Sequence, residues 1–153
     1  MRHVRSLSRK LARFRRLSAR ERRIFVSSLV LVPGVKVLLV LTGLRLTLAA
    51  CARWASPRPM SDVMTGAAAE RAAVETFQMV RAAARLTVGR KSCLPLALVT
   101  RLHLAAQGIE PRLHLGARKH LGQFEAHAWL ELGSLTLDPV SADAQFVPFV
   151  RAS

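Results

Sequence analysis

The sequence predicts an α+β fold, in which N-terminal helices and a helix that begins at Cys93 pack on a small antiparallel sheet. Apolar residues recur at helical spacing over residues 67–87 and 93–107. From residue 109 onward they alternate with polar residues, as in strands that bury one face. Because 51% of the 153 residues are hydrophobic, the chain can form a packed core, and global disorder is disfavoured.

The N-terminal region is expected to be helical after a basic tail over residues 1–17. Ser18 and Glu21 have the S-x-x-E spacing of a capping box, in which each side chain can bond the backbone amide of the other residue. The apolar run that follows is interrupted at Pro33-Gly34. This interruption predicts two helices, over residues 19–32 and 35–53, that meet at a bend.

The positive charge is concentrated in this region. Residues 1–60 hold 14 Lys and Arg against the single acid Glu21, a net charge of +13, whereas residues 61–153 carry a net charge of +2. Such a charge suits acidic partners, phosphates or an anionic membrane surface, although a high-GC coding bias toward Arg would also produce it. Because no nucleic-acid-binding motif accompanies the charge, nucleic acid is not an expected partner.

A membrane-spanning helix is not expected from uninterrupted apolar length. The longest uncharged stretches, residues 24–35 and 37–44, are shorter than the ~18–20 residues that a bilayer requires. A lipoprotein signal ending at Cys51 is disfavoured because the basic start is long and charges interrupt the apolar part. Two alternatives remain for residues 1–53, namely peripheral contact with a membrane and packing against the C-terminal core.

The chain is divided into a basic tail (1–17), an N-terminal helical region with a linker (18–66), and a C-terminal domain (67–153). The linker is placed at residues 54–66, which contain Pro, Ser and Gly. In the C-terminal domain we expect a helix over residues 67–87, a helix over 93–107 that Gly108 ends, and a strand over 109–117.

A polar turn over residues 119–123 is expected to lead into a hairpin. Residues 124–132 and 135–137 are its predicted strands, joined at Gly133-Ser134. The last residues contain Phe146, Val147, Phe149 and Val150, which indicate a further short or edge strand that buries its aromatic side chains.

Cys93, His127 and Asp138 are the candidate catalytic residues. The unpaired amides and the dipole at a helix start favour a thiolate at Cys93, and Arg90 and Lys91 add positive charge nearby. Strand alternation separates His127 from the aliphatic face, and a short hairpin can bring Asp138 to its ring. Cys, His and Asp on a helix and two successive strands is the order typical of papain-like and transglutaminase-like thiol sites.

Each of these residues also has a structural interpretation. A Cys at a helix start is often a small buried side chain, a strand His is often structural, and Asp-Pro is common in turns. A zinc site formed by His114, His120 and His127 is a weaker alternative, because no Cys or acid stands at metal-ligand spacing. A disulfide framework is not indicated by two cysteines, and no cofactor motif is present, so neither a metal nor a cofactor is expected.

Several motifs resemble those of the lasso-peptide biosynthesis B2 proteins, which are transglutaminase-like cysteine proteases. The resemblance begins with Leu17-Ser18-x-x-Glu21-Arg22-Arg23 and covers residues 17–140. Its main motifs are Cys93-Leu94-Pro95-x-Ala97, Gly108-x-x-Pro111-x-Leu113-x-Leu115-Gly116 and Phe124-x-Ala126-His127-Ala128-Trp129-x-Glu131. The Ala-His-Ala-Trp motif is shared with wider transglutaminase-like proteins, and its combination with Cys-Leu-Pro is more specific.

The resemblance implies a transglutaminase-like core and removal of a leader peptide from a lasso-peptide precursor. Cys93 would be the nucleophile, His127 the base and then the acid, and Asp138 the residue that orients the ring. It also implies two protein partners, a leader-recognition B1 protein and an ATP-dependent macrolactam synthetase. Because the N-terminal segment is predicted to be helical, we expect a separate B1 protein rather than the fused strand-rich module of some members.

Two other functions remain open. The same thiol could serve another acyl transfer, such as transglutamination, or the chain could be a non-catalytic basic adaptor on a membrane or nucleic acid. The expected location is the cytoplasm. Peripheral contact with the inner membrane surface through residues 1–53 is compatible with that location.

Overall fold

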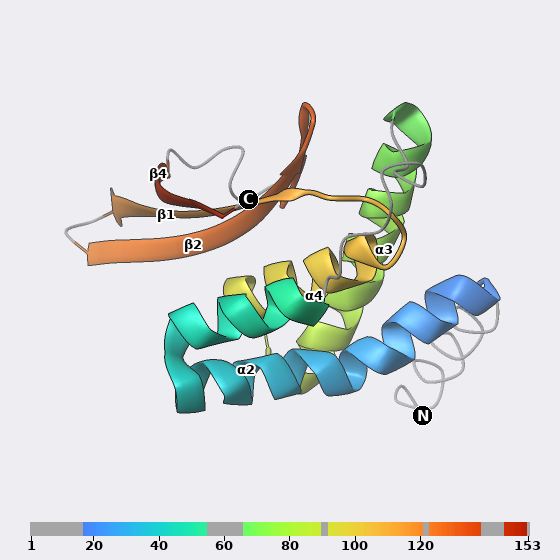
Figure 1. The fold of residues 1–153 in the computed structure, drawn as a ribbon, viewed down its shortest axis with the longest axis horizontal. Coiled ribbons are helices and arrows are strands. Elements are labelled where there is room, and N and C mark those ends of the chain that lie inside the picture. The colour runs from blue at the N-terminus through green and yellow to red at the C-terminus, as the bar shows by residue number, and fades with distance from the viewer. Residues whose placement is uncertain (1–16, 55–65, 90–91, 121–122, 139–145, 153) are drawn as a thin grey trace, which may run out of the picture.

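The computed structural model has the α+β architecture that the sequence predicts (Figure 1). It describes residues 17–54, 66–89, 92–120, 123–138 and 146–152. The described helices are α2 (Ala19–Trp54), α3 (Gly66–Thr87) and α4 (Cys93–Ala105). The described strands are β1 (Arg112–His120), β2 (Gln123–Leu132), β3 (Leu135–Leu137) and β4 (Val147–Ala152). The basic tail and the linker at residues 55–65 lie outside the described residues, apart from Leu17.

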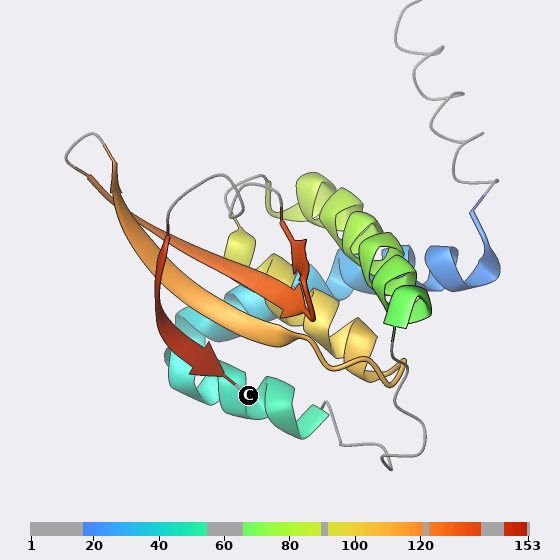
Figure 2. The same cartoon turned by 90° about the horizontal axis from the view of Figure 1, so that it is seen from above.

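The four strands form one antiparallel sheet in the order β3-β2-β1-β4 (Figure 2). The predicted turn between β2 and β3 is confirmed, with Gly133 at φ 60°, a conformation that suits glycine. The last residues form the edge strand β4. Of the aromatic side chains expected to be buried there, that of Phe146 is half-buried and that of Phe149 is not described; Val147 is exposed.

The first long strand is displaced by three residues from its predicted position. It was expected over residues 109–117, but β1 begins at Arg112, after Pro111, and continues to His120. Proline has no N–H to donate to a strand ladder, which accounts for the later start. The expected turn over residues 119–123 is correspondingly shorter, and its centre, residues 121–122, lies outside the described residues.

The bend predicted at Pro33-Gly34 is wrong, because α2 reverses direction at Gly43 instead. Gly43 has φ 76° and ψ 176°, whereas Pro33 lies inside the helix. A positive φ strains residues that carry a Cβ atom, so glycine adopts this reversal at a lower conformational free energy than other residues. Figure 1 shows the resulting hairpin, whose two arms lie below α4 in that view.

The predicted capping box at the start of α2 is confirmed. The backbone N–H of Ser18 donates to the Glu21 carboxylate over 2.7 Å, and the backbone N–H of Glu21 donates to Ser18 Oγ over 3.2 Å. These bonds satisfy amides that have no partner within the helix.

The membrane-spanning potential of α2 is larger than its uninterrupted apolar stretches predict. Lys36 is the single charge between Ile24 and Leu44, and an 18-residue window of α2 has a mean hydropathy of 2.4. By length and composition, therefore, α2 could cross a membrane. In the described fold it also contributes to the core, because Ile24, Val32 and Val35 are buried.

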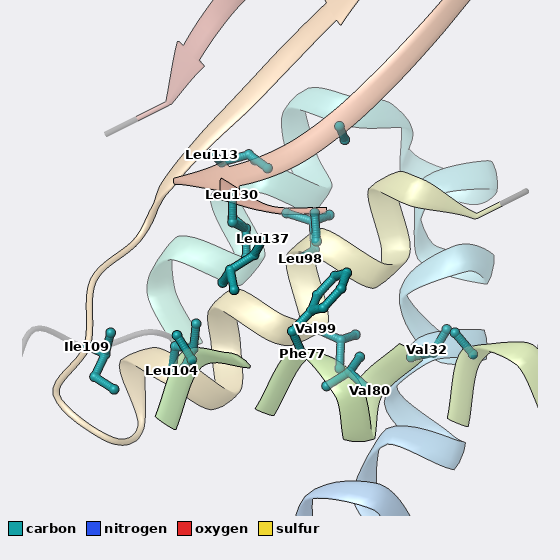
Figure 3. Packing of buried hydrophobic residues seen from close by; sticks show 14 of the residues in the cluster. Val32, Phe77, Val80, Leu98, Val99, Leu104, Ile109, Leu113, Leu130 and Leu137 are labelled. Atoms are coloured by element: carbon teal, nitrogen blue, oxygen red, sulfur yellow. The ribbon is translucent and has the colours of Figure 1, made fainter. Parts of the chain in front are cut away.

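The core lies between the helices and the inner face of the sheet (Figure 3). Leu98, Val99 and Leu104 of α4 stand at its centre and are almost fully buried. Leu113, Leu130 and Leu137 reach them from the sheet, Phe77 and Val80 from α3, and Val32 from α2. The N-terminal helix thus packs on the C-terminal core, as expected for a sheet too small to form a core alone.

Candidate active site

The three predicted catalytic residues line one open cleft of about 810 Å³. Cys93 is the first residue of α4, His127 lies in β2, and Asp138 directly follows β3. Cys93 and Asp138 are 45 positions apart in the sequence. The packing of α4 on the sheet brings them, with His127, to one surface.

His127 and Asp138 form a close, partly buried pair. His127 Nε2 lies 3.0 Å from Asp138 Oδ2, and their side chains are 13% and 12% exposed. The low exposure limits competition from water, so this contact can fix both the position and the tautomer of the imidazole. Because Nε2 faces Asp138, Nδ1 is the ring nitrogen left for the hydrogen bond to the Cys93 thiol.

Cys93 is held at the start of α4 by its neighbours. The first helical bond runs from the Leu96 amide to the Ser92 carbonyl over 3.1 Å, so the amides of Cys93 and Leu94 precede the internal ladder. Pro95 occupies the first turn, where its missing N–H costs no helical bond. The Leu94 N–H donates a hydrogen bond to the Cys93 sulfur, so an amide at the helix start points toward the thiol.

A second backbone donor comes from the sheet. Pairing between β2 and β3 ends at Leu130 and Leu137. Ala128 lies two residues before Leu130 in β2, and its N–H donates a hydrogen bond to the Cys93 sulfur. The short length of β3 thus leaves an amide of β2 available to the thiol.

The environment of Cys93 favours the thiolate. Burial opposes ionisation, but the hydrogen bond with His127, the Ala128 N–H, the imidazolium charge and the Leu94 N–H together lower the pKa of the Cys93 thiol below its ordinary value. For Cys51, in contrast, burial raises the thiol pKa despite the nearby Arg101.

His127 is correspondingly held in its protonated form. The hydrogen bond to Asp138 and the one to Cys93 raise the pKa of His127 to about 9, against the opposing effect of burial. At neutral pH the arrangement therefore favours a thiolate on Cys93 beside an imidazolium on His127. Such a pair supplies both a nucleophile and a proton donor for acyl transfer.

Aromatic rings pack against the imidazole of His127. Its ring stacks on Phe146 at 5.1 Å and on Trp129 at 6.3 Å between centroids. Opposite His127 on β1 stands Gly116, where a Cβ atom would lie 2.9 Å from Trp129 Cη2 and 2.9 Å from the Val147 carbonyl oxygen. The glycine therefore makes room for the indole that supports the imidazole.

Arg118 links the outer rim of the cleft to this aromatic group. Its guanidinium carbon lies 4.9 Å from the centre of the Phe146 ring, and its Nη2 is 2.7 Å from Glu125 Oε2. These contacts position Phe146 on the face of His127. Arg81 and Arg85 of α3 also line the cleft, whereas Arg90 and Lys91, which were expected to add positive charge, lie outside the described residues.

Three groups that support the catalytic side chains were not predicted from the sequence. The Ala128 amide, Phe146 and Arg118 were not singled out, because their roles depend on strand length and on cross-strand register. The only signal for Phe146 was an aromatic residue near the chain end, and the position of Gly116 opposite His127 follows only from the strand register.

The alternative chemistries can be compared with the described side chains. Cys51 and Cys93 are both free thiols. No group of three or more His, Cys, Asp or Glu side chains in the described ranges is arranged to hold a metal ion. His103, within α4, hydrogen-bonds Ser28 of α2 over 3.1 Å and serves packing between these helices.

Comparison with known proteins identifies one family. A model of the transglutaminase-like superfamily matches residues 38–151, which include most of the described chain and all three candidate residues. No curated protein and no solved structure matches the sequence.

Proposed function

The chain belongs to the transglutaminase-like superfamily, and we propose that it is a cysteine peptidase that removes the leader from a lasso-peptide precursor. Members of this superfamily are usually cysteine hydrolases or transferases. The observation that carries the proposal is the contact of Cys93, His127 and Asp138 in one open cleft. The choice of substrate depends on the resemblance of the Cys-Leu-Pro and Ala-His-Ala-Trp motifs to the lasso-peptide B2 proteins.

In the first step, the Cys93 thiolate attacks the carbonyl carbon of the leader's last residue. A C–S bond forms, and the carbonyl electrons move to oxygen, where the Cys93 backbone N–H can stabilise them. When the C–N bond breaks, the imidazolium of His127 gives its proton to the departing amine of the core peptide. The leader remains on Cys93 as a thioester.

In the second step, water hydrolyses the thioester. His127, now neutral, takes a proton from the attacking water, and Asp138 stabilises the imidazolium that forms again. The C–S bond breaks, the leader leaves as a carboxylate, and Cys93 returns to the thiolate. No other reactant is consumed, so the cycle balances with one water per peptide bond.

We further propose that a separate B1-type protein delivers the precursor and that an ATP-dependent macrolactam synthetase receives the core peptide. The resemblance of the Cys-Leu-Pro and Ala-His-Ala-Trp motifs to the lasso-peptide B2 proteins is what supports both partners. The released core amine is the nucleophile that macrolactam formation needs, so cleavage of the peptide bond must precede ring closure.

The test is incubation of the full-length protein with a candidate precursor and the B1 protein, followed by mass spectrometry. The proposal predicts free leader with a new carboxylate, free core, and loss of both in Cys93→Ala but not in Cys51→Ala. Cleavage that persists in Cys93→Ala would refute it. Adding a primary amine separates the alternatives, because a transferase would yield leader joined to the amine in preference to the carboxylate.

A further inference from the structure

Helix α2 carries an apolar stripe that the fold leaves exposed. Val26, Val30, Val37 and Leu41 are 52%, 73%, 56% and 77% exposed. Their separations of four, seven and four residues place them on one side of a helix with 3.6 residues per turn. Val40 lies beside them and is 80% exposed. We call these five residues the outer stripe.

The opposite side of the same helix is buried. Ile24, Ser28, Val32 and Val35 face α3 and α4, and Ser28 reaches His103 of α4. The first arm of α2 is therefore apolar on both sides, with one side occupied by the core. Apolar residues on a solvent-facing helical side commonly mark an interaction surface when they are contiguous.

The second arm of α2 extends this surface. Leu44, Leu46 and Trp54 are exposed there, Trp54 at 76%. Between the two arms lies an apolar groove of about 350 Å³, bordered by Val30 of the outer stripe and by Trp54. Exposed Trp beside aliphatic residues is a frequent feature of helices that lie in a membrane interface.

Basic side chains surround the apolar surface. Arg22, Arg23, Lys36, Arg45 and Arg53 of α2 are all exposed. In the sequence as a whole, residues 1–60 contain 14 basic residues and one acid. An apolar stripe with basic margins is complementary to acyl chains below a layer of anionic headgroups.

We propose that α2 docks the protein on the surface of an anionic bilayer, with the outer stripe turned toward the acyl chains. This proposal is independent of the peptidase activity. Docking in the plane of the surface keeps Ile24 and Val32 in the core and preserves the Ser28–His103 contact, which a spanning α2 would have to break. An apolar patch that binds a protein partner would not require so large an excess of basic over acidic residues.

The orientation also suits an accessible cleft. Figure 1 shows α2 on the side of α4 that lies away from the sheet, whereas His127 and Asp138 belong to the sheet side. A membrane against the outer stripe would therefore leave the cleft open to the aqueous phase.

The experiment is co-sedimentation of the full-length protein with vesicles of phosphatidylcholine alone or mixed with phosphatidylglycerol. We expect binding to the anionic vesicles, weaker binding to the neutral ones, and release by salt. The variant Val37→Glu/Leu41→Glu should lower the partition coefficient roughly a hundredfold, because two apolar contacts are lost and two negative charges are added. Leu86→Glu, at an exposed leucine of α3, is the matched control and should bind like the wild type.

Circular dichroism establishes that each variant is folded. Quenching of Trp54 fluorescence by brominated lipid provides a second readout in the wild-type protein, since Trp129 is buried. Equal binding to neutral and anionic vesicles, equal loss in the α2 and α3 variants, or an unquenched Trp54 would overturn the proposal. Absence of vesicle binding would do the same.

Discussion

His127 Nε2 lies 3.0 Å from Asp138 Oδ2, although the two residues stand on opposite sides of the β2–β3 turn. This contact connects the fold to the chemistry. The hairpin brings the carboxylate to the imidazole, and the carboxylate helps to raise the pKa of His127 to about 9. Because the ring stays protonated, the Cys93 thiolate has a positive neighbour throughout the neutral range.

Replacing Asp138 by Asn should slow peptide cleavage by roughly 10²- to 10⁴-fold, because the amide cannot stabilise the imidazolium. It should also change the pH profile. The imidazolium is lost as pH rises through the pKa of His127, so the alkaline fall in kcat/KM, expected near pH 9 in the wild type, should move to lower pH. An unchanged profile would show that Asp138 does not act on His127.

The two cysteines should differ in reactivity toward iodoacetamide. The Cys93 pKa is lowered and the Cys51 pKa is raised, so Cys93 should be alkylated at lower pH than a free thiol and Cys51 at higher pH. Peptide mapping by mass spectrometry over a pH series measures both sites in one sample. Similar profiles for the two residues would contradict the activation of Cys93.

Gly116→Ala should disturb the site without touching a catalytic residue. The new Cβ would meet the Trp129 ring and a backbone carbonyl at 2.9 Å, and the carbonyl cannot move without shifting β4. We expect a loss of about 1–3 kcal/mol in the free energy of unfolding, measured by urea denaturation, together with a lower kcat. Gly34→Ala is the matched control, since nothing lies within 4 Å of its Cβ position.

The reversal of α2 at Gly43 can be tested in the same way. Gly43→Ala places a side chain at φ 76° and should destabilise the protein by about 1–2 kcal/mol. Gly34→Ala, within the first arm, should have the opposite sign, a gain of up to about 1 kcal/mol from helix propensity. If the two substitutions had the same effect, the assignment of the reversal to Gly43 would be wrong.

Much of the fold was predictable because local patterns persist in the structure. The capping box at Ser18 and Glu21, the start of α4 at Cys93 and the turn at Gly133 all depend on interactions within a few residues. The position of the α2 reversal was not predictable from Pro33, because a long apolar helix can carry a proline when packing against α3 and α4 supports it.

The candidate site was also predictable in part. Residue type and order singled out Cys93, His127 and Asp138, and the structure places them together. The role of Phe146 depends on a long-range contact with His127, and that of the Ala128 amide depends on where β3 ends. Neither leaves a periodic signal in a single sequence.

The most direct test of a thiolate–imidazolium pair is an NMR titration of the His127 ring in the full-length protein. We predict a pKa of about 9 in the wild type and a clear decrease in both Cys93→Ala and Asp138→Asn, because each variant removes one of the two contacts that raise it. A wild-type His127 that titrates near its ordinary value of 6.5, or one that is insensitive to both substitutions, would contradict the account.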